Sequence, residues 1–430
     1  MLKRLLTVLS FTVLPVSSYA LTIEEAVNYA LESNNLIKSQ QLTVKSKDLA
    51  RQGAILIFLP NMGAEYNYAY NWQDKGKAAG KNELGTGSLS AYVRLNIFNG
   101  LNDLALYQTA RIDRDMSKLQ LDAVGYDTIL NAQNAYVRVL KSKRDLEVSK
   151  SHLKALEMQK RDAQISADNG LIAKNDLLQT ETYLAQAQLQ VITAESMVTK
   201  ALQNLERVID KKNLKNEQFY DPDVKNVNIG SEEDLTNKMF ANNSKLKAQE
   251  KSYELAKKTE MRAMSKVYPK IDAFFNYATY GEDGAITGGI PMKGENEMSV
   301  GVTASWDVVG IAVSAVDSVS KKRSRQALAY NIANTKQDMV LDLQSAIETY
   351  YTSLAKLRQA KIAVKHAEEN YRVTKNLYDQ SATTMTNLLD ASTKLNEAKV
   401  QESSANYEVI NSVYYLERVI EEKLPVNNSK

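Results

Sequence analysis

An internal duplication constrains this sequence more than any other feature. The five residues Leu205–Ile209 recur unchanged as Leu416–Ile420, 211 positions later. Other matches keep nearly the same spacing: Asn34, Lys38 and Pro60 reappear as Asn243, Lys247 and Pro269, and Phe98–Asn99 as Trp306–Asp307. Such steady offsets indicate a tandem repeat of one structural unit. We expect a first copy over 21–210, a polar linker over 211–230, a second copy over 231–424 and a short tail over 425–430.

Both copies are predicted to contain a helix, two strands, a long helix, a sharp turn and a second long helix. Each copy opens with a capping box, Thr22–Glu25 in the first and Ser231–Asp234 in the second. The opening helices should end before Pro60 and Pro269, because proline breaks a helix interior. Residues 101–169 contain no proline and a single glycine, so one helix of roughly 100 Å can form there. A second helix is expected over 172–210.

The predicted helices carry a heptad pattern. In the first copy the seam consists of Leu177, Thr180, Leu184, Ala187, Val191, Ala194, Val198, Ala201, Leu205 and Val208. In the second copy it consists of Leu388, Ala391, Leu395, Ala398, Glu402, Ala405, Val409, Ser412, Leu416 and Val419. A period of about 3.5 residues predicts left-handed coiled coils. The helices alone are compatible both with a helical conduit and with a coiled-coil rod that has no pore.

Between the helices the hydrophobic period shortens to about 2, which predicts strands over 61–73, 88–99, 270–281 and 297–308. One side of these strands is apolar and rich in aromatic residues. It includes Tyr66, Tyr68, Tyr70, Trp72, Val93, Leu95, Phe275, Tyr277, Val302 and Trp306. A half-buried sheet of a soluble protein gives the same alternation. Four such strands, with polar, glycine-rich segments at 74–87 and 282–296, instead favour an outer-membrane barrel whose apolar side faces lipid.

Four strands are too few to close a barrel, since the smallest barrels have about eight. An open edge in lipid would leave backbone N–H and C=O groups unpaired, at a cost of several kcal/mol each. Several chains must therefore share one barrel. Two chains would supply eight strands filled by side chains, and three would supply twelve strands with room for a lumen.

The first twenty residues have the pattern of a signal peptide, which predicts export. Lys3 and Arg4 precede an apolar stretch over 5–16, and small residues stand before position 21. Without Lys3 and Arg4, the 54 basic residues become 52 against 51 acidic ones. This net charge of +1 gives no support to nucleic-acid binding.

The composition also argues against an enzyme. The chain has no cysteine and only two histidines, His152 and His366, which we expect on the surface of charge-rich helices. No glycine-rich phosphate loop is present. We therefore predict no catalytic site, no metal site and no cofactor.

Several segments, taken in order and in duplicate, carry a resemblance to a known family. They are Leu21–Val27, Leu59–Pro60, Ile97–Gly100, Gly170–Ala173, Asp176–Leu178 and Asn387–Asp390. With them the chain resembles the TolC family of outer-membrane efflux proteins over nearly all of its mature length. The second copy ends its strands with Trp306–Val309, which lacks the expected glycine pair, so that junction is predicted to differ.

The resemblance implies a mainly α fold with a small β part. Long coiled-coil helices would form a periplasmic α-barrel, continuous with a twelve-stranded outer-membrane β-barrel that a homotrimer shares. It implies a passive exit channel of a tripartite efflux pump, including multidrug efflux, or of a type I secretion system. The partners would be a periplasmic adaptor (membrane fusion) protein and an inner-membrane pump of RND, ABC or MFS type, with outer-membrane lipid around the barrel. A coiled-coil envelope scaffold without a pore is the alternative.

The turns between the long helices are candidate gates at a periplasmic tip. Gly170 suits a left-handed helix end, and Asn175 or Asp176 can cap the next helix. In a symmetric assembly a carboxylate here becomes a ring, which favours cations. By resemblance, Asp390 and Asn387 match a two-carboxylate constriction in which Asn387 is an amide instead.

The resemblance also implies a latch and an adaptor contact. Asp176 and Tyr378 match a pair whose hydrogen bond helps to hold the tip closed, and Thr383 stands where an arginine of that latch is expected. The adaptor would contact the two turns. The turn residues are Gly170, Leu171 and Ile172 in the first copy, and Ser381 and Ala382 in the second.

Overall fold

The computed structural model describes residues 20–74, 81–170, 172–222, 227, 229–282 and 296–425. For residues 20, 70–74, 81–86 and 280–282 it describes the backbone only. Most of the predicted signal peptide and tail therefore lies outside the described residues, as does Leu171. No helix in the described ranges is long and apolar enough to cross a membrane.

The chain divides into two compact units. The helical unit comprises Met1–Lys38, Val124–Asn243 and Val340–Lys430, and the sheet unit comprises Ser39–Ala123 and Ser244–Met339. Two long helices, α4 (Asn102–Asp168) and α8 (Val308–Asp379), contribute residues to both units.

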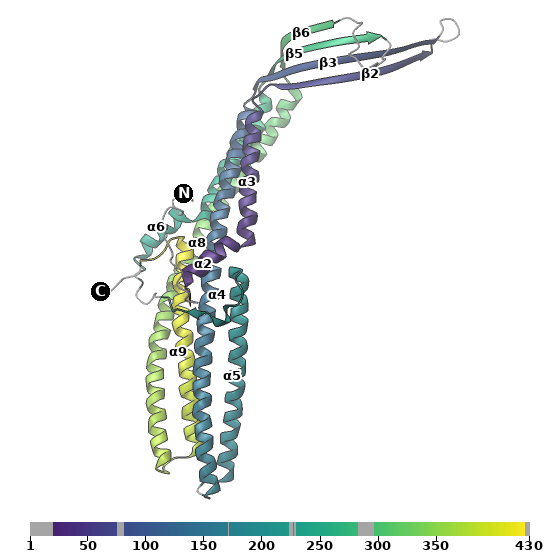
Figure 1. Cartoon of the computed structure of the whole chain (residues 1–430). Coiled ribbons are helices and arrows are strands. Elements are labelled where there is room, and N and C mark those ends of the chain that lie inside the picture. Colours follow the sequence, from purple (N-terminus) through teal and green to yellow (C-terminus); the bar gives the residue numbers. More distant parts are fainter. Residues whose placement is uncertain are drawn as a thin grey trace, which may run out of the picture. The chain divides into compact units, whose positions relative to one another are not determined.

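In the helical unit, α4 and α8 run beside two helices that follow them in the chain, α5 (Lys174–Ile209) and α9 (Met385–Ile420) (Figure 1). The shorter elements of this unit are β1 (Ala20–Leu21), α2 (Ile23–Ser33), η1 (Leu214–Asn216), β4 (Gln218–Phe219) and α6 (Glu232–Asn242). Strands β1 and β4 form a small parallel pair that the sequence did not predict.

The opening segment of each copy forms two helices rather than the single helix we expected. In the first copy α2 ends at Ser33 and α3 (Asn35–Leu56) follows; in the second, α6 is followed by α7 (Ser244–Ala263). The breaks fall at Asn34 and Asn243, which have extended ψ angles of 120° and 114°. The Asn34 side chain accepts a hydrogen bond from the Leu36 amide at 2.7 Å, a local turn that competes with the helix.

The repeated Leu-Glu-Arg-Val-Ile segment has a buried leucine and the same glutamate hydrogen bond in both copies. Its leucines, Leu205 and Leu416, are fully buried. The carboxylate of each glutamate accepts a hydrogen bond from a backbone amide in the segment that follows the helix. Glu206 accepts from the Leu214 amide and Glu417 from the Leu424 amide, both at 3.0 Å. The helix then ends in a left-handed residue, Asp210 or Glu421.

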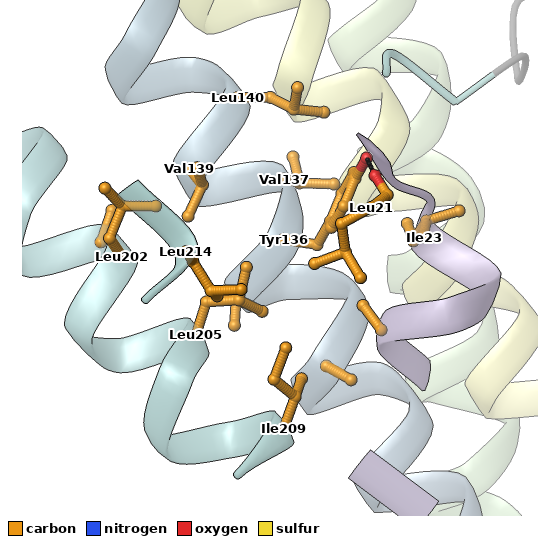
Figure 2. Packing of buried hydrophobic residues seen from close by; sticks show 14 of the residues in the cluster. Leu21, Ile23, Tyr136, Val137, Val139, Leu140, Leu202, Leu205, Ile209 and Leu214 are labelled. Carbon is orange, nitrogen blue, oxygen red and sulfur yellow. Dashed lines mark hydrogen bonds between the residues drawn. The ribbon is translucent and has the colours of Figure 1, made fainter. Parts of the chain in front are cut away.

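A buried cluster joins the start of the chain to the long helices. It contains Leu21 of β1, Val137 of α4 and Leu205 of α5, together with their neighbours (Figure 2). The hydroxyl of the fully buried Tyr136 lies 2.8 Å from the Leu21 carbonyl oxygen and accepts the Tyr220 amide at 3.0 Å. Burial raises the pKa of Tyr136 to about 12, so this hydroxyl stays protonated.

The sheet unit contains one antiparallel sheet with the strand order β2-β3-β5-β6 (Figure 1). The strands are β2 (Asn61–Asp74), β3 (Lys81–Asn99), β5 (Lys270–Glu282) and β6 (Asn296–Ser305), and η2 (Met264–Val267) precedes β5. Each copy supplies one hairpin, so the described residues contain the four-stranded sheet that the sequence predicted. β3 begins at 81 rather than 88, because residues 81–87 of the expected loop pair with β2.

The predicted alternation is present in the register of the sheet. Val93 pairs with Met62 on one side and with Phe275 on the other, and Phe275 pairs with Val300. Directly paired residues share a face. The same face includes Tyr66, Tyr68, Leu95, Tyr277 and Val302. For Tyr70 and Trp72 only the backbone is described, and it follows the same register.

Two apolar residues near strand ends, Ile97 and Trp306, fall outside the regular pairing of the sheet. The register of β3 against β5 shifts between Asn96 and Phe98, so Ile97 is the extra residue of a bulge. Strand β6 ends at Ser305, so Trp306 lies beyond it, exposed, and its indole N–H donates to the Val267 carbonyl oxygen at 3.2 Å. The alternation of apolar and polar residues continues past Ser305, where strand pairing stops. For this reason the predicted strand, 297–308, ends later than β6.

The two strand-to-helix junctions differ, as the missing glycine pair predicted. In the first copy Gly100 and Leu101 both have left-handed φ angles, 66° and 67°. A Cβ atom at Gly100 would collide with the Ser265 carbonyl group, so only glycine fits there. In the second copy Asp307 instead accepts the Gly310 amide at 2.9 Å and caps α8.

Candidate functional site at the interhelical turns

The first turn, between α4 and α5, closes on Gly170. Its φ is +71°, and its amide donates to the Ala167 carbonyl oxygen at 3.0 Å. Apart from its two chain neighbours, no described residue has an atom within 4 Å of where a Cβ would be, so the glycine serves the backbone conformation rather than a close contact. Ile172 turns back onto the helices and is half-buried.

Helix α5 begins differently from the prediction. Its N-cap is Ala173, whose side chain makes no capping hydrogen bond. Asn175 and Asp176 lie inside the first turn, so the prediction that one of them caps the helix is wrong. The half-buried Asp176 still places a negative charge where the helix dipole is positive.

The second turn, between α8 and α9, repeats the first with a different residue. Ser381 is left-handed, with φ +59°, and stands 211 positions after Gly170. Its amide donates to the Tyr378 carbonyl oxygen and the Ala382 amide donates to that of Leu377, both at 2.8 Å. These two bonds form a Schellman motif.

Thr383, Thr384 and Asn387 form a local polar group at the start of α9. The Thr384 hydroxyl oxygen accepts the Asn387 amide at 3.4 Å as the N-cap. The Asn387 side-chain amide donates to the Thr383 hydroxyl at 2.9 Å. Thr383 stands where the resemblance implies an arginine, and Asn387 stands where it implies a carboxylate. These two residues contact each other.

Asp390 is exposed, one helical turn further along α9. Its carboxylate accepts a hydrogen bond from the Tyr183 hydroxyl of α5 at 2.8 Å. This hydrogen bond, and secondarily burial, raises the pKa of Tyr183. One turn closer to the tip, the Thr386 hydroxyl donates to the Gln179 side-chain oxygen at 2.9 Å. Sequence reasoning identified Asp390 but not Tyr183 or Gln179.

Asp176 influences Tyr378 through the electrostatic effect of its carboxylate on the Tyr378 pKa. Burial raises the pKa of Tyr378, and the carboxylates of Asp176, Asp379 and Asp162 raise it further. Within the described part of this chain, no hydrogen bond joins the Tyr378 hydroxyl to Asp176. The latch inferred from the resemblance is therefore not formed by this pair in the single chain.

An apolar cluster holds the ends of the long helices together near the turns. Its buried members are Leu156, Ala163, Ala187, Met385, Leu388 and Leu389, from α4, α5 and α9. Tyr371 and Tyr378 of α8 pack against it, as does Tyr183. This cluster positions the turns of both copies relative to each other, since all these residues belong to the helical unit.

The surface prediction is wrong for His152 and agrees for His366. His152 is only 9% exposed, and its Nδ1 lies 3.5 Å from the Ser392 hydroxyl oxygen of α9. Its burial lowers its pKa. The neighbouring charged residues Lys150 and Lys154 of α4 are exposed, whereas His152 between them is not. His366 is exposed.

Comparison with known proteins agrees with the fold. The profile of the outer membrane efflux protein family matches residues 26–210 and again 235–420, which confirms the duplication. The chain therefore belongs to the outer membrane efflux protein family. A search of curated protein sequences gives no significant match.

Solved outer-membrane channels have the same fold at low sequence identity. The Campylobacter jejuni CmeC channel is 14% identical, with a TM-score of 0.81 over 95% of this chain and 87% of that one. The open state of the Neisseria gonorrhoeae MtrE channel is 14% identical, with a TM-score of 0.79 over 96% and 94%. The Vibrio cholerae outer membrane protein VceC is 12% identical, with a TM-score of 0.80 over 93% and 96%.

Proposed function

We propose that three copies of this chain form one exit channel of an efflux or secretion system. The observation that carries the proposal is the sheet. It has four strands, and β2 and β6 each pair with one neighbour only among the described strands. Its apolar face leaves Tyr68 and Val302 50% and 66% exposed in the single chain. Pairing β6 of one chain with β2 of the next removes both edges, and three chains give a closed barrel of about twelve strands with a lumen.

The long helices of the three chains would continue this barrel as a helical conduit. The turns at Gly170 and Ser381 would form its periplasmic tip. There, threefold symmetry repeats every side chain as a ring. Asp390, with Asn387 one turn before it and Asp176 on α5, would line the constriction and favour cations.

The adaptor would contact the two turns of each chain. The residues proposed for this contact are Gly170, Leu171 and Ile172 in one turn, and Ser381 and Ala382 in the other. A periplasmic adaptor and an inner-membrane pump of RND, ABC or MFS type would open the tip and supply the cargo. The likeness to CmeC and MtrE, both outer membrane channels, supports this role.

Planar-bilayer recording on the purified chain tests the proposal, together with the mass of the detergent-solubilised oligomer. We expect a trimer that passes discrete, cation-selective currents. A monomer that passes no current would instead identify a coiled-coil scaffold.

The partners require a separate experiment. Photo-crosslinking residues placed at Ile172 and Ala382 should capture an adaptor in intact envelopes, and mass spectrometry should identify it. The control position is Glu408, an exposed residue of α9 far along the helix from the turn. Equal capture at all three positions would contradict a specific contact at the tip.

A further inference from the structure

Two polar pairs link α5 to α9 beside the tip, and together we call them the α5–α9 ladder. The first pair is Thr386 with Gln179, at 2.9 Å, and the second is Tyr183 with Asp390, at 2.8 Å. The partners in both pairs are 207 positions apart in the chain. On each helix the two ladder residues are four positions, or about one turn, apart.

This ladder joins the two copies of the repeat. Helix α5 closes the first copy and α9 closes the second, and both helices start at a tip turn. Because both pairs have the same offset, they lock one register of α5 against α9. The buried side chains of Ala187 and Leu388 belong to the apolar cluster that packs beside the ladder.

The two pairs differ in charge. The Gln179–Thr386 pair joins two neutral side chains. In the other pair, the neutral Tyr183 hydroxyl donates a hydrogen bond to the Asp390 carboxylate. Hydrogen bonds to a charged group are shorter and stronger than neutral ones. Among the described residues, Tyr183 is the only hydrogen-bond donor from another helix to Asp390. The Tyr183 ring is itself fixed, because it packs against the apolar cluster.

We propose that Tyr183 is a positioning residue that holds the Asp390 carboxylate in one orientation at the channel mouth. An exposed aspartate on a helix otherwise samples several rotamers. In a threefold ring, that freedom spreads the negative charge over a wider region and weakens the field that a passing cation meets. This inference rests on the proposed channel function and on the proposed place of Asp390 in its constriction.

Ion selectivity of the full-length channel in planar bilayers tests the inference. The variants are Tyr183→Phe, Asp390→Asn and the two combined, each measured by reversal potential in a potassium chloride gradient. Tyr183→Phe keeps the ring and its packing and removes only the hydroxyl. We expect it to shift the cation preference part of the way toward that of Asp390→Asn, and to add nothing when Asp390 is already replaced.

Tyr371→Phe is the matched control. Tyr371 packs against the same cluster, and its hydroxyl accepts a hydrogen bond from Gln159 at 3.2 Å rather than donating to a carboxylate. It also joins helices from the two copies, α8 and α4. A general loosening of the tip would therefore appear in Tyr371→Phe as well, whereas loss of carboxylate positioning would not.

The outcomes separate this inference from the channel itself. If the unmodified chain passes no current, the proposed function fails first. If the unmodified channel is cation-selective but Tyr183→Phe leaves selectivity unchanged, or changes it equally with Asp390 replaced, Tyr183 does not position Asp390. Should Tyr183→Phe fail to assemble, Tyr183→Met also lacks the hydroxyl, and the same comparison applies to it.

Discussion

At the scale of single residues, the two tip turns fill one backbone position differently. Gly170 and Ser381 both adopt a left-handed conformation that ends a long helix. Glycine reaches this conformation without steric cost, whereas an L-residue pays roughly 1–2 kcal/mol. The second turn is therefore the more strained of the two, although its hydrogen bonds are complete.

Exchanging the residues between the turns tests this strain. We expect Ser381→Gly to raise the free energy of unfolding by up to about 1 kcal/mol, and Gly170→Ser to lower it by about 1 kcal/mol. Thermal unfolding in detergent, followed by circular dichroism, measures both. Opposite shifts are the expected result, and a loss in both variants would contradict the conformational explanation.

A second residue-scale prediction concerns Glu417. Burial raises its pKa above the ordinary value of 4.5, although the Leu424 amide partly opposes the shift. A carboxyl whose folded pKa is raised favours folding only while it is protonated. Its charged form therefore lowers stability as the pH rises from about the unfolded value, 4.5, through the higher folded value.

Glu417→Gln should remove this pH dependence and keep an oxygen for the Leu424 amide. We expect equal stability of variant and parent in acid, and a gain in stability for the variant near neutral pH. Unfolding midpoints across pH 4–8 provide the measurement. Glu206→Gln, at the matching position of the first copy, is the control, and a larger gain there would rule out the explanation.

At the scale of elements, single side chains join segments that are distant in the chain. The Tyr136 hydroxyl of α4 bonds to backbone groups of Leu21 and Tyr220, next to β1 and β4. Tyr350 of α8 donates to the Val227 carbonyl oxygen at 3.1 Å. In each copy a tyrosine of the long helix, Tyr136 or Tyr350, thus forms a hydrogen bond with the backbone of a distant segment.

Tyr136→Phe is expected to leave buried backbone groups without their partner. The cost should be about 1–3 kcal/mol of unfolding free energy, since these groups cannot recover a hydrogen bond from water. Unfolding midpoints measure the loss, and amide exchange of the Leu21 region should quicken with it. Tyr29→Phe, which alters an exposed hydroxyl, should change neither.

At the scale of the whole molecule, the proposed assembly explains both the exposed apolar face of the sheet and the paired turns. The apolar face needs lipid, and the strand edges need further strands. In the proposed channel, symmetry repeats a carboxylate at the tip around the axis, which strengthens the field on a passing ion. In that proposal, oligomerisation comes before any gating or selectivity.

Asp390→Ala is the prediction at this scale. Removing a ring of carboxylates should lower the cation preference and increase the width of the mouth, measured by reversal potential and single-channel conductance. Glu408→Ala, which removes a carboxylate elsewhere on α9, should leave both unchanged. Unaltered selectivity in Asp390→Ala would remove this residue from the constriction.

Local patterns in the sequence determined the duplication, the order of strands and long helices, the apolar face of the sheet and the left-handed turn at Gly170. Each of these follows from periodicity or from the conformational limits of one residue. The burial of His152 and the Tyr183–Asp390 hydrogen bond depended on tertiary structure. Partners 207 positions apart meet only through the register in which two helices pack, and no local pattern specifies that register.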